Sequence, residues 1–283
     1  MSSNRASQPI AIFDSGLGGL TVVAEIHRQL PHENLLFLAD RARVPYASQS
    51  VPLIARWASE CFDFLLAHDP KAVVIACNTV SAVYLNELRE QTPVPVIGVI
   101  EPTARAAVKA TRSGRIGVVA TKATVRRRAY DVALAHLRAD LQIASSGAAL
   151  LVPLVEEGWT TGEIPRKVVE HYLEPLKRER VDTVVLGCTH YEYFVSIMQQ
   201  IMGNGVQIIN TPHVTTLELV SLLTERNELR SENRAGTVGV YSTDINEALE
   251  RVVNDLFAEG LPTGQITVQS AQIPPFRARL HHS

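Results

Sequence analysis

The chain has 283 residues, of which 46% are hydrophobic and 20% are charged, and its formal net charge is -2. This composition is typical of a globular protein with a sizeable core, and it excludes a disordered or collagen-like chain. A net charge close to zero gives no global attraction for nucleic acid or for an anionic membrane, so we expect neither as a direct partner.

The cysteine count and the N-terminal segment indicate a cytoplasmic protein. The first nine residues are polar and lack the apolar stretch of a secretory signal peptide. The longest apolar runs are interrupted before the roughly 18 residues that a membrane span needs. Three cysteines, an odd and sparse number, favour a reducing compartment over a disulfide-stabilised fold.

Short apolar runs rich in β-branched residues alternate along the chain with longer amphipathic stretches. Such runs are typical of parallel strands covered on both faces, and the alternation predicts an α/β fold. In chain order, the expected strands are 10–13, 35–39, 72–76, 94–99, 115–120, 183–186, 206–209 and 237–241. The expected helices are 20–30, 52–67, 80–91, 103–111, 124–137, 165–178, 192–202, 214–225 and 245–258.

The chain also has a weak internal sequence similarity. Segments 12–15 and 118–121 each end a predicted strand and open a helix, and segments 74–79 and 185–190 each place a cysteine after a strand. Two similar offsets suggest two related α/β halves. Chance similarity between apolar strands is the alternative interpretation.

Two of the cysteines stand where open parallel sheets bind their ligands. Cys77 and Cys188 each follow a predicted buried strand and precede a predicted helix. A helix N-terminus at that point stabilises a thiolate, and the polar residues after each cysteine can bind a carboxylate. Cys61 lies inside an amphipathic helix, and we interpret it as a core residue. Neither strand-end cysteine has a second ligand at zinc-finger spacing, so we expect no metal site.

Two thiols on opposite sides of a small ligand suit one kind of chemistry. One thiol can remove a proton from one face of a carbon atom while the other returns a proton to the opposite face, which inverts a stereocentre. Without a cofactor, such a site must stabilise a carbanion-like transition state through preorganised hydrogen bonds and supply bases of matched pKa.

A glycine-rich turn follows the first predicted strand. Gly16, Gly18 and Gly19 do not have the spacing of a dinucleotide-binding loop, so we interpret them as a tight turn. Asp14, at the strand end, could orient an ammonium group or a neighbouring thiol. A helix cap is the alternative role for Asp14 or Ser15.

Six segments, taken together, resemble the glutamate racemases, a cofactor-independent family of the aspartate/glutamate racemase superfamily. The segments occur in the family order and fall between residues 10 and 215, and they are specific as a set rather than singly. They are 13–21, 42–46, 76–79, 99–102, 152–158 and 186–191.

The resemblance implies two pseudo-symmetric α/β domains, each a mostly parallel sheet flanked by helices, with the active site in the cleft between them. We place residues 1–98 and 212–283 in the first domain and residues 99–211 in the second. The implied reaction is racemisation of L-glutamate to D-glutamate for peptidoglycan, with no pyridoxal phosphate, other cofactor or metal. The resemblance also implies a homodimer.

Two other functions stay open at this point. The first is racemisation of another acidic amino acid, such as aspartate. The second is a racemase-fold protein that acts through a protein partner, because some members of the family inhibit DNA gyrase. The presence of both thiols with Asp14 and His190 argues against an inactive binding protein.

The resemblance assigns roles residue by residue. In the family, the cysteine that matches Cys77 takes the α-proton from D-glutamate, and the cysteine that matches Cys188 takes it from L-glutamate. Asp14 and His190 match residues that support the two thiols. The position of His190, two residues after a candidate catalytic cysteine, independently suits an imidazole that tunes the thiol or relays its proton.

A glutamate is expected to assist as well, and of Glu156 and Glu157 we favour Glu157. Tyr46 and Ala47 match a backbone clamp on the side-chain carboxylate of the substrate. The full set of positions that match substrate-binding residues is Asp14, Ser15, Tyr46, Ala47, Asn78, Thr79, Thr121, Thr189 and His190.

The chain departs from the family pattern without losing a catalytic group. Arg41 stands where the family usually has threonine, and Ala47 replaces a glycine, which is costly if the backbone there needs a positive φ. Val80 and the segment 210–213 also differ. We interpret the run of arginines at 126–128 as a solvated helix face, with binding of an anionic effector or partner as the alternative.

Overall fold

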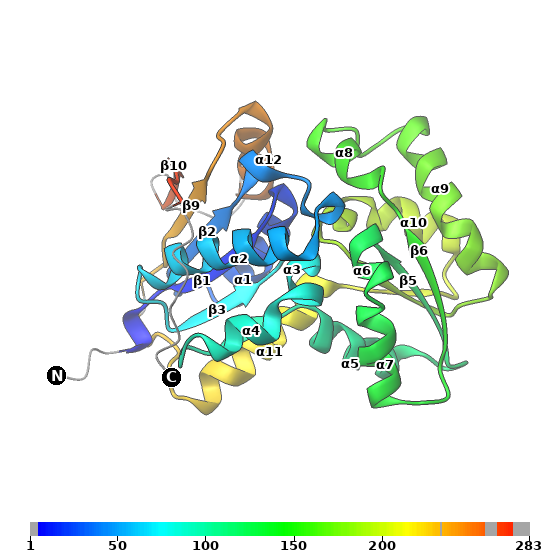
Figure 1. The fold of residues 1–283 in the computed structure, drawn as a ribbon, viewed down its shortest axis with the longest axis horizontal. Coiled ribbons are helices and arrows are strands. Elements are labelled where there is room, and N and C mark those ends of the chain that lie inside the picture. Colours follow the sequence, from blue (N-terminus) through cyan, green and yellow to red (C-terminus); the bar gives the residue numbers. More distant parts are fainter. Residues whose placement is uncertain (1–4, 233, 258–264, 274–283) are drawn as a thin grey trace.

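A computed structural model describes residues 5–232, 234–257 and 265–273. The chain forms two parallel sheets flanked by helices, which confirms the predicted fold class (Figure 1). The first sheet has the strand order β10 (Ile266–Ser270), β9 (Val238–Ser242), β2 (Leu35–Ala39), β1 (Ile10–Asp14), β3 (Ala72–Ile75) and β4 (Val96–Gly98). The second sheet has the order β6 (Gln142–Gly147), β5 (Arg115–Ala120), β7 (Thr183–Gly187) and β8 (Gln207–Ile209).

The two sheets share one topology. The order β2-β1-β3-β4 in the first sheet has the same sequence of crossovers as β6-β5-β7-β8 in the second. Strand β3 therefore corresponds to β7, and Cys77 and Cys188 follow these equivalent strands. This correspondence supports the interpretation that the internal sequence similarity comes from two related α/β halves.

The helices cover both faces of each sheet. On the first sheet, α1, α11 and α12 pack on one face, and α2, α3 and α4 pack on the other. On the second sheet, α8, α9 and α10 cover one face, and α5 and α7 cover the other. The longer helices are α1 (Leu20–Gln29), α2 (Val51–Leu66), α5 (Ile100–Ala110), α9 (Glu163–Arg178), α10 (Val195–Met202), α11 (Thr211–Glu225) and α12 (Glu247–Phe257).

Burial on both faces explains why the strands were readable from the sequence. In β1, Ile10 and Ile12 point into one core cluster, while Ala11 and Phe13 point into the other. A strand of this kind needs apolar residues at every position, which gives an uninterrupted run. The described part of the chain contains no helix that is both long and apolar enough to cross a membrane.

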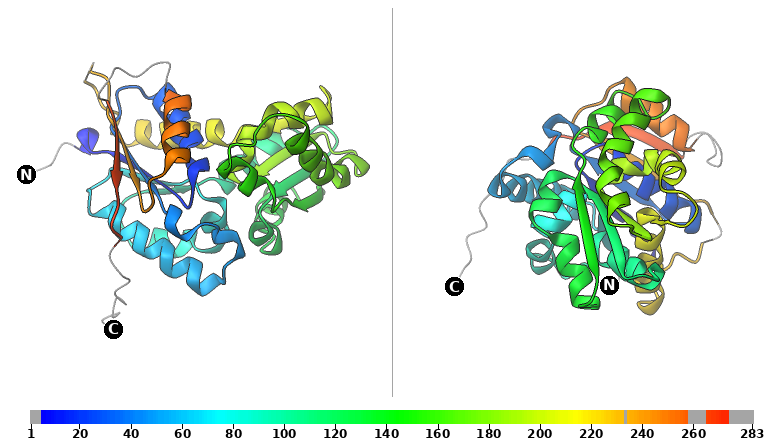
Figure 2. Two further views of the ribbon diagram at one scale, coloured as in Figure 1. Left: turned by 90° about the horizontal axis from the view of Figure 1, so that it is seen from above. Right: turned by 90° about the vertical axis from the view of Figure 1, so that its right-hand side faces the viewer.

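The chain passes between the sheets twice. It leaves the first sheet after β4 and runs through α5 to β5, and it returns from β8 through α11 to β9. Figure 2 shows the resulting two units side by side. The positions of these crossings support the proposal that residues 1–98 with 212–283, and residues 99–211, form two domains.

Several elements differ from the sequence prediction. The strands β6 and β10 were not predicted, and each is an outer strand of its sheet with partly exposed polar residues. The predicted helix 124–137 is interrupted at Arg128, which adopts a left-handed conformation with φ 52°. The last residue predicted for the final helix, Ala258, lies outside the described residues. The remaining helices are α3 (Asn78–Val83), α4 (Leu85–Glu90), α6 (Lys122–Arg126), α7 (Ala129–Leu137) and the unpredicted α8 (Leu151–Glu156).

Candidate active site

The carboxyl ends of β1, β3, β5 and β7 meet at a small internal cavity between the two sheets. Its volume is about 30 Å³. Almost all of the predicted site residues line it, although they come from segments far apart in the sequence. The lining residues are Asp14, Ser15, Val44, Pro45, Tyr46, Ala47, Cys77, Asn78, Thr79, Thr121, Val152, Cys188, Thr189 and His190.

Cys77 lies on the first-domain side of this cavity, next to the end of β1. Its Sγ is 3.4 Å from Ser15 Oγ, and the Asp14 carboxylate in turn accepts hydrogen bonds from Ser15 Oγ and from the backbone N–H of Gly16. Burial and the nearby charge of Asp14 raise the pKa of Cys77 to about 12, against the opposing effect of Ser15. Burial therefore favours the thiol form of Cys77 over the thiolate.

Cys188 lies on the second-domain side and has a different partner. His190 Nδ1 is 3.8 Å from Cys188 Sγ, and His190 Nε2 is 2.9 Å from Glu156 Oε1. Burial disfavours the charged imidazolium, but the contacts with Cys188 and Glu156 outweigh it and raise the pKa of His190 to about 10. Burial likewise disfavours the Glu156 carboxylate, yet hydrogen bonds from His190 and Arg41 lower its pKa to about 2. The two side chains form an ion pair beside the thiol.

Asp14 joins the two halves of the site. Thr189 Oγ1 donates a hydrogen bond of 2.7 Å to Asp14 Oδ2, which connects the end of β1 with the segment after β7. Burial raises the pKa of Asp14, while the positive charge of His190 and the hydrogen bond from Thr189 act in the opposite direction. Groups from both domains thus hold the carboxylate in place.

Asn78 offers an unused hydrogen-bond donor. Its Oδ1 accepts a hydrogen bond of 2.7 Å from Tyr130 Oη, which fixes the orientation of the amide. In the part of the chain that the structure describes, the buried Nδ2 atom has no partner. A buried donor without a partner is costly, so this amide suits a ligand that brings an acceptor such as a carboxylate. Tyr130 was not singled out from the sequence.

Threonine hydroxyls form the neighbouring wall of the cavity. Thr79 Oγ1 lies 3.3 Å from Thr121 Oγ1, which joins α3 of the first domain to the start of α6 in the second. Thr121 also accepts a hydrogen bond from the backbone N–H of Thr124 and so caps α6. Each hydroxyl can both donate and accept, so the wall can adapt to carboxylate or ammonium groups.

Residues 44–47, in the loop after β2, line the cavity. The Tyr46 phenol and Arg43 Nε both donate to the Asp40 carboxylate, and the Arg43 guanidinium lies 5.3 Å from the centre of the Trp57 ring. Because the phenol is occupied by Asp40, the lining surface at Tyr46 and Ala47 is available for the predicted backbone clamp. Ala47 is not among the described residues with positive φ, so alanine causes no backbone strain there.

The glycines after β1 allow the two domains to approach closely. A Cβ atom on Gly18 would lie 2.4 Å from Thr189 Oγ1 and 2.6 Å from the backbone nitrogen of His190. A Cβ on Gly16 would lie 3.0 Å from His190 Cε1. The turn predicted from the sequence is present, but the structure adds a second reason for glycine, which is contact with the opposite domain.

Glu156, rather than the favoured Glu157, lies next to His190 in the structure. Helix α8 ends at Glu156, and Glu156 is the residue that contacts His190, whereas the Glu157 side chain is exposed and outside the cavity. One residue along a helix turns the side chain by about 100°, which takes Glu157 away from the site. Arg41, which stands where the family usually has threonine, also contacts Glu156.

The remaining candidates take structural or surface positions. Cys61 lies in the core cluster under the first sheet, as predicted, and burial raises the pKa of its thiol. Residues 126–128 are all exposed, and Arg128 pairs with Asp131 at 3.5 Å, as expected of a solvated face. Within the described residues, no group of three or more His, Cys, Asp or Glu side chains could hold a metal ion.

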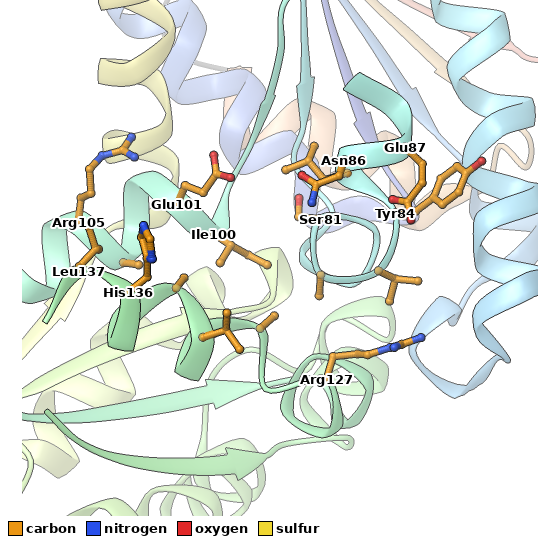
Figure 3. Close-up of a pocket in the computed structure, with 17 residues that line it drawn as sticks. Ser81, Tyr84, Asn86, Glu87, Ile100, Glu101, Arg105, Arg127, His136 and Leu137 are labelled. Carbon is orange, nitrogen blue, oxygen red and sulfur yellow. The ribbon is translucent and has the colours of Figure 1, made fainter. Parts of the chain in front are cut away.

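A larger cavity, of about 630 Å³, lies elsewhere, between α4, α5 and α7 (Figure 3). Its lining includes apolar side chains such as Ile100 and Leu137 and charged side chains such as Glu101 and Arg127. None of the predicted site residues lines it. Size alone would therefore select a different cavity, because the two strand-end cysteines line the small one together with Asp14 and His190.

Comparisons with known proteins agree with this arrangement. The family profile described as Asp/Glu/hydantoin racemase matches residues 17–219. The glutamate racemase of Exiguobacterium sibiricum is 40% identical over 249 residues, which are 88% of this chain and 92% of that protein.

Solved structures show the same similarity. A glutamate racemase isoform from Bacillus anthracis superposes with a TM-score of 0.89 and 35% identity, covering 94% of this chain and 98% of that one. The glutamate racemase of Francisella tularensis in complex with D-glutamate gives a TM-score of 0.87 and 29% identity, covering 96% and 100%.

Proposed function

The chain belongs to the Asp/Glu/hydantoin racemase family and is an amino-acid racemase, and from that premise we propose that it interconverts L- and D-glutamate without a cofactor, using Cys77 and Cys188 as the two bases. Glutamate is favoured as the substrate because the similar proteins are glutamate racemases, one of them in complex with D-glutamate.

The observation that carries this proposal is the pair of buried cysteines at equivalent strand ends on one cavity, each with its own partners. In the L-to-D direction, the Cys188 thiolate takes the α-proton, and the Cys77 thiol delivers its own proton to the opposite face of the same carbon atom. Cys188 is then a thiol and Cys77 a thiolate, which is the form needed for the reverse reaction. The raised pKa of Cys77 favours the thiol, which is the form that this direction requires.

Supporting groups divide between the two thiols. Ser15 and Asp14 lie beside Cys77, and His190 with Glu156 lies beside Cys188. We propose that the imidazolium and its carboxylate partner hold the charge that develops as a proton moves to or from Cys188. The unpaired Asn78 amide is the group we assign to a substrate carboxylate.

Binding of substrate requires the site to open. A cavity of about 30 Å³ has room for roughly one water molecule, and glutamate is several times larger. We propose that the two domains separate to admit the substrate and close again around it. Closure then excludes water and brings the groups of both domains to the reacting carbon atom.

The decisive experiment is circular dichroism of L-glutamate and, separately, D-glutamate with pure protein and no added cofactor, with solvent deuterium incorporation as a second readout. We expect both signals to decay to zero with deuterium at Cα. We expect Cys77→Ala and Cys188→Ala to abolish racemisation, while Cys61→Ala, which removes the core thiol, keeps it. Near-wild-type turnover in either site variant would disprove the two-base mechanism.

The same experiment separates the other candidate functions. Faster turnover of aspartate than of glutamate would replace the proposed substrate. A flat signal with both amino acids over a range of pH would favour a binding protein, with DNA gyrase as the partner to test.

Cellular role and assembly follow from the resemblance. We propose that the enzyme supplies D-glutamate for peptidoglycan in the cytoplasm and that it is a homodimer. Analytical ultracentrifugation tests the dimer. Rescue by this chain of a strain that requires D-glutamate tests the cellular role.

A further inference from the structure

Arg41 bridges the two domains at the edge of the site. It follows β2 of the first domain, and its side chain is only 7% exposed. Its Nη2 donates a hydrogen bond of 3.0 Å to Glu156 Oε2, on α8 beside the second sheet. Its Nη1 donates to Asn246 Oδ1 at 2.6 Å and points to the Asp244 carbonyl oxygen at 3.4 Å. The guanidinium is therefore anchored in its own domain while it holds a carboxylate of the other.

Glu156 uses its two oxygens for two different partners. Oε2 accepts from Arg41, and Oε1 faces His190 Nε2 at 2.9 Å. His190 in turn reaches Cys188 Sγ through Nδ1 at 3.8 Å. A continuous series of polar contacts thus runs from a loop of the first domain to the thiol of the second.

We propose that Arg41 is a positioning residue that latches the two domains closed and, in closing them, orients Glu156 and His190 toward Cys188. This inference rests on the proposed function and adds to it a residue for which the resemblance predicts no role. The contact joins the two domains, so domain separation breaks it and closure restores it. A charge-assisted pair with little solvent exposure is stronger and more directional than an exposed one.

Two features indicate that Arg41 stabilises the closed arrangement of the domains rather than the fold of either domain. Arg41 and Asn246 belong to the same domain, so their contact survives opening. The Arg41 contact with Glu156 is the part that opening removes. A planar guanidinium offers parallel N–H groups in fixed directions, whereas an ammonium is a single flexible point charge, so lysine replaces it only in part.

The test compares Arg41→Met, Arg41→Lys and Glu156→Gln with the double variant Arg41→Met/Glu156→Gln. We expect Arg41→Met to lower kcat/KM by about 10- to 100-fold, the size of loss that follows misplacement of a catalytic group by about 1 Å. We expect Arg41→Lys to recover part of that loss. If Arg41 acts through Glu156, the double variant is no worse than Glu156→Gln alone.

Arg105→Met is the matched control, since Arg105 also joins two elements through a carboxylate, Glu218, at 2.7 Å, but both side chains are exposed and neither lines the small cavity that holds the cysteines. It should keep wild-type kcat/KM. Far-UV circular dichroism and thermal unfolding establish that each variant is folded. If Arg41→Met does not fold, Arg41→Lys takes its place in the comparison with Glu156→Gln.

Three results would overturn the proposal: unchanged kcat/KM in Arg41→Met, no recovery with lysine, or losses from Arg41→Met and Glu156→Gln that multiply in the double variant. These outcomes are distinct from failure of the proposed function, in which the wild-type protein itself does not racemise glutamate.

Discussion

The Thr189 hydroxyl donates a hydrogen bond of 2.7 Å to Asp14 Oδ2 and so ties the carboxyl end of β1 to the segment after β7. The bond stabilises the ionised form of a buried carboxyl group whose pKa burial raises. It also joins the two domains at the cavity that both cysteines line. The same hydrogen bond therefore favours ionisation of Asp14 and holds the two domains together.

Replacing Thr189 by valine should shift the pH profile of the reaction. Valine keeps the shape of threonine but removes the donor, so the pKa of Asp14 should rise further and the acidic limb of kcat/KM should move to higher pH. Thr189→Ser, which keeps the hydroxyl, is the control and should leave the limb in place. An unmoved limb in Thr189→Val would show that Asp14 ionisation does not limit turnover.

Neighbouring glutamates on and after α8 should behave differently. Glu156→Gln removes the anionic partner of His190, and we expect kcat/KM to fall by about 100-fold, within the range of a lost acid-base group. Glu157→Gln changes an exposed side chain outside the cavity, and we expect an effect of no more than about twofold. Steady-state racemisation assays in both directions measure kcat/KM for the two variants. A larger loss in Glu157→Gln would restore the prediction made from the sequence.

Gly18→Ala should prevent closure. The added Cβ would lie 2.6 Å from the backbone nitrogen of His190, which cannot move aside without shifting the opposite domain. We expect folded protein with kcat/KM reduced by at least about 100-fold. Gly205→Ala is the control, because an added Cβ there meets no atom within 4 Å. Full activity in Gly18→Ala would mean that the reacting form is more open than the structure described above.

The ion pair of His190 with Glu156 should make stability depend on pH in the alkaline range. The folded-state pKa of His190 is raised from 6.5 to about 10, so its stabilisation is complete below the lower value and is lost as the pH rises through the upper one. Between these values, the free energy of unfolding of the wild type should fall more steeply than that of His190→Gln. Urea unfolding at a series of pH values measures both slopes. Equal slopes would show that His190 is uncharged in the folded protein.

The sequence was most informative where burial is complete. Strands such as β1 and β5 are apolar at nearly every position because both faces are covered, and they were located almost to the residue. The outer strands β6 and β10 lack that covering, so their sequences carry polar residues and were overlooked. Arg128 breaks a predicted helix through a left-handed backbone that no periodicity reveals.

Site residues at strand ends were predictable for a related reason. Cys77 and Cys188 each follow a buried strand of a different sheet, and topology places each of them at the carboxyl edge of its own sheet. The choice between Glu156 and Glu157 depends on where a short helix ends, which the sequence did not show. The contact of Arg41 with Glu156 depends on how two domains meet, and this is decided by packing of segments that are distant in the chain.

The pairing of β2 with β9 has a consequence for biosynthesis. Residues 238–242 form β9, which lies between β10 and β2 in the first sheet, yet they are translated after every strand of the second sheet. The second domain can therefore fold on the ribosome while the first still awaits its last strands. Both cysteines emerge long before Asn246 exists to anchor Arg41, so a nascent chain would carry its reactive thiols well before it could hold them in a finished, closed site.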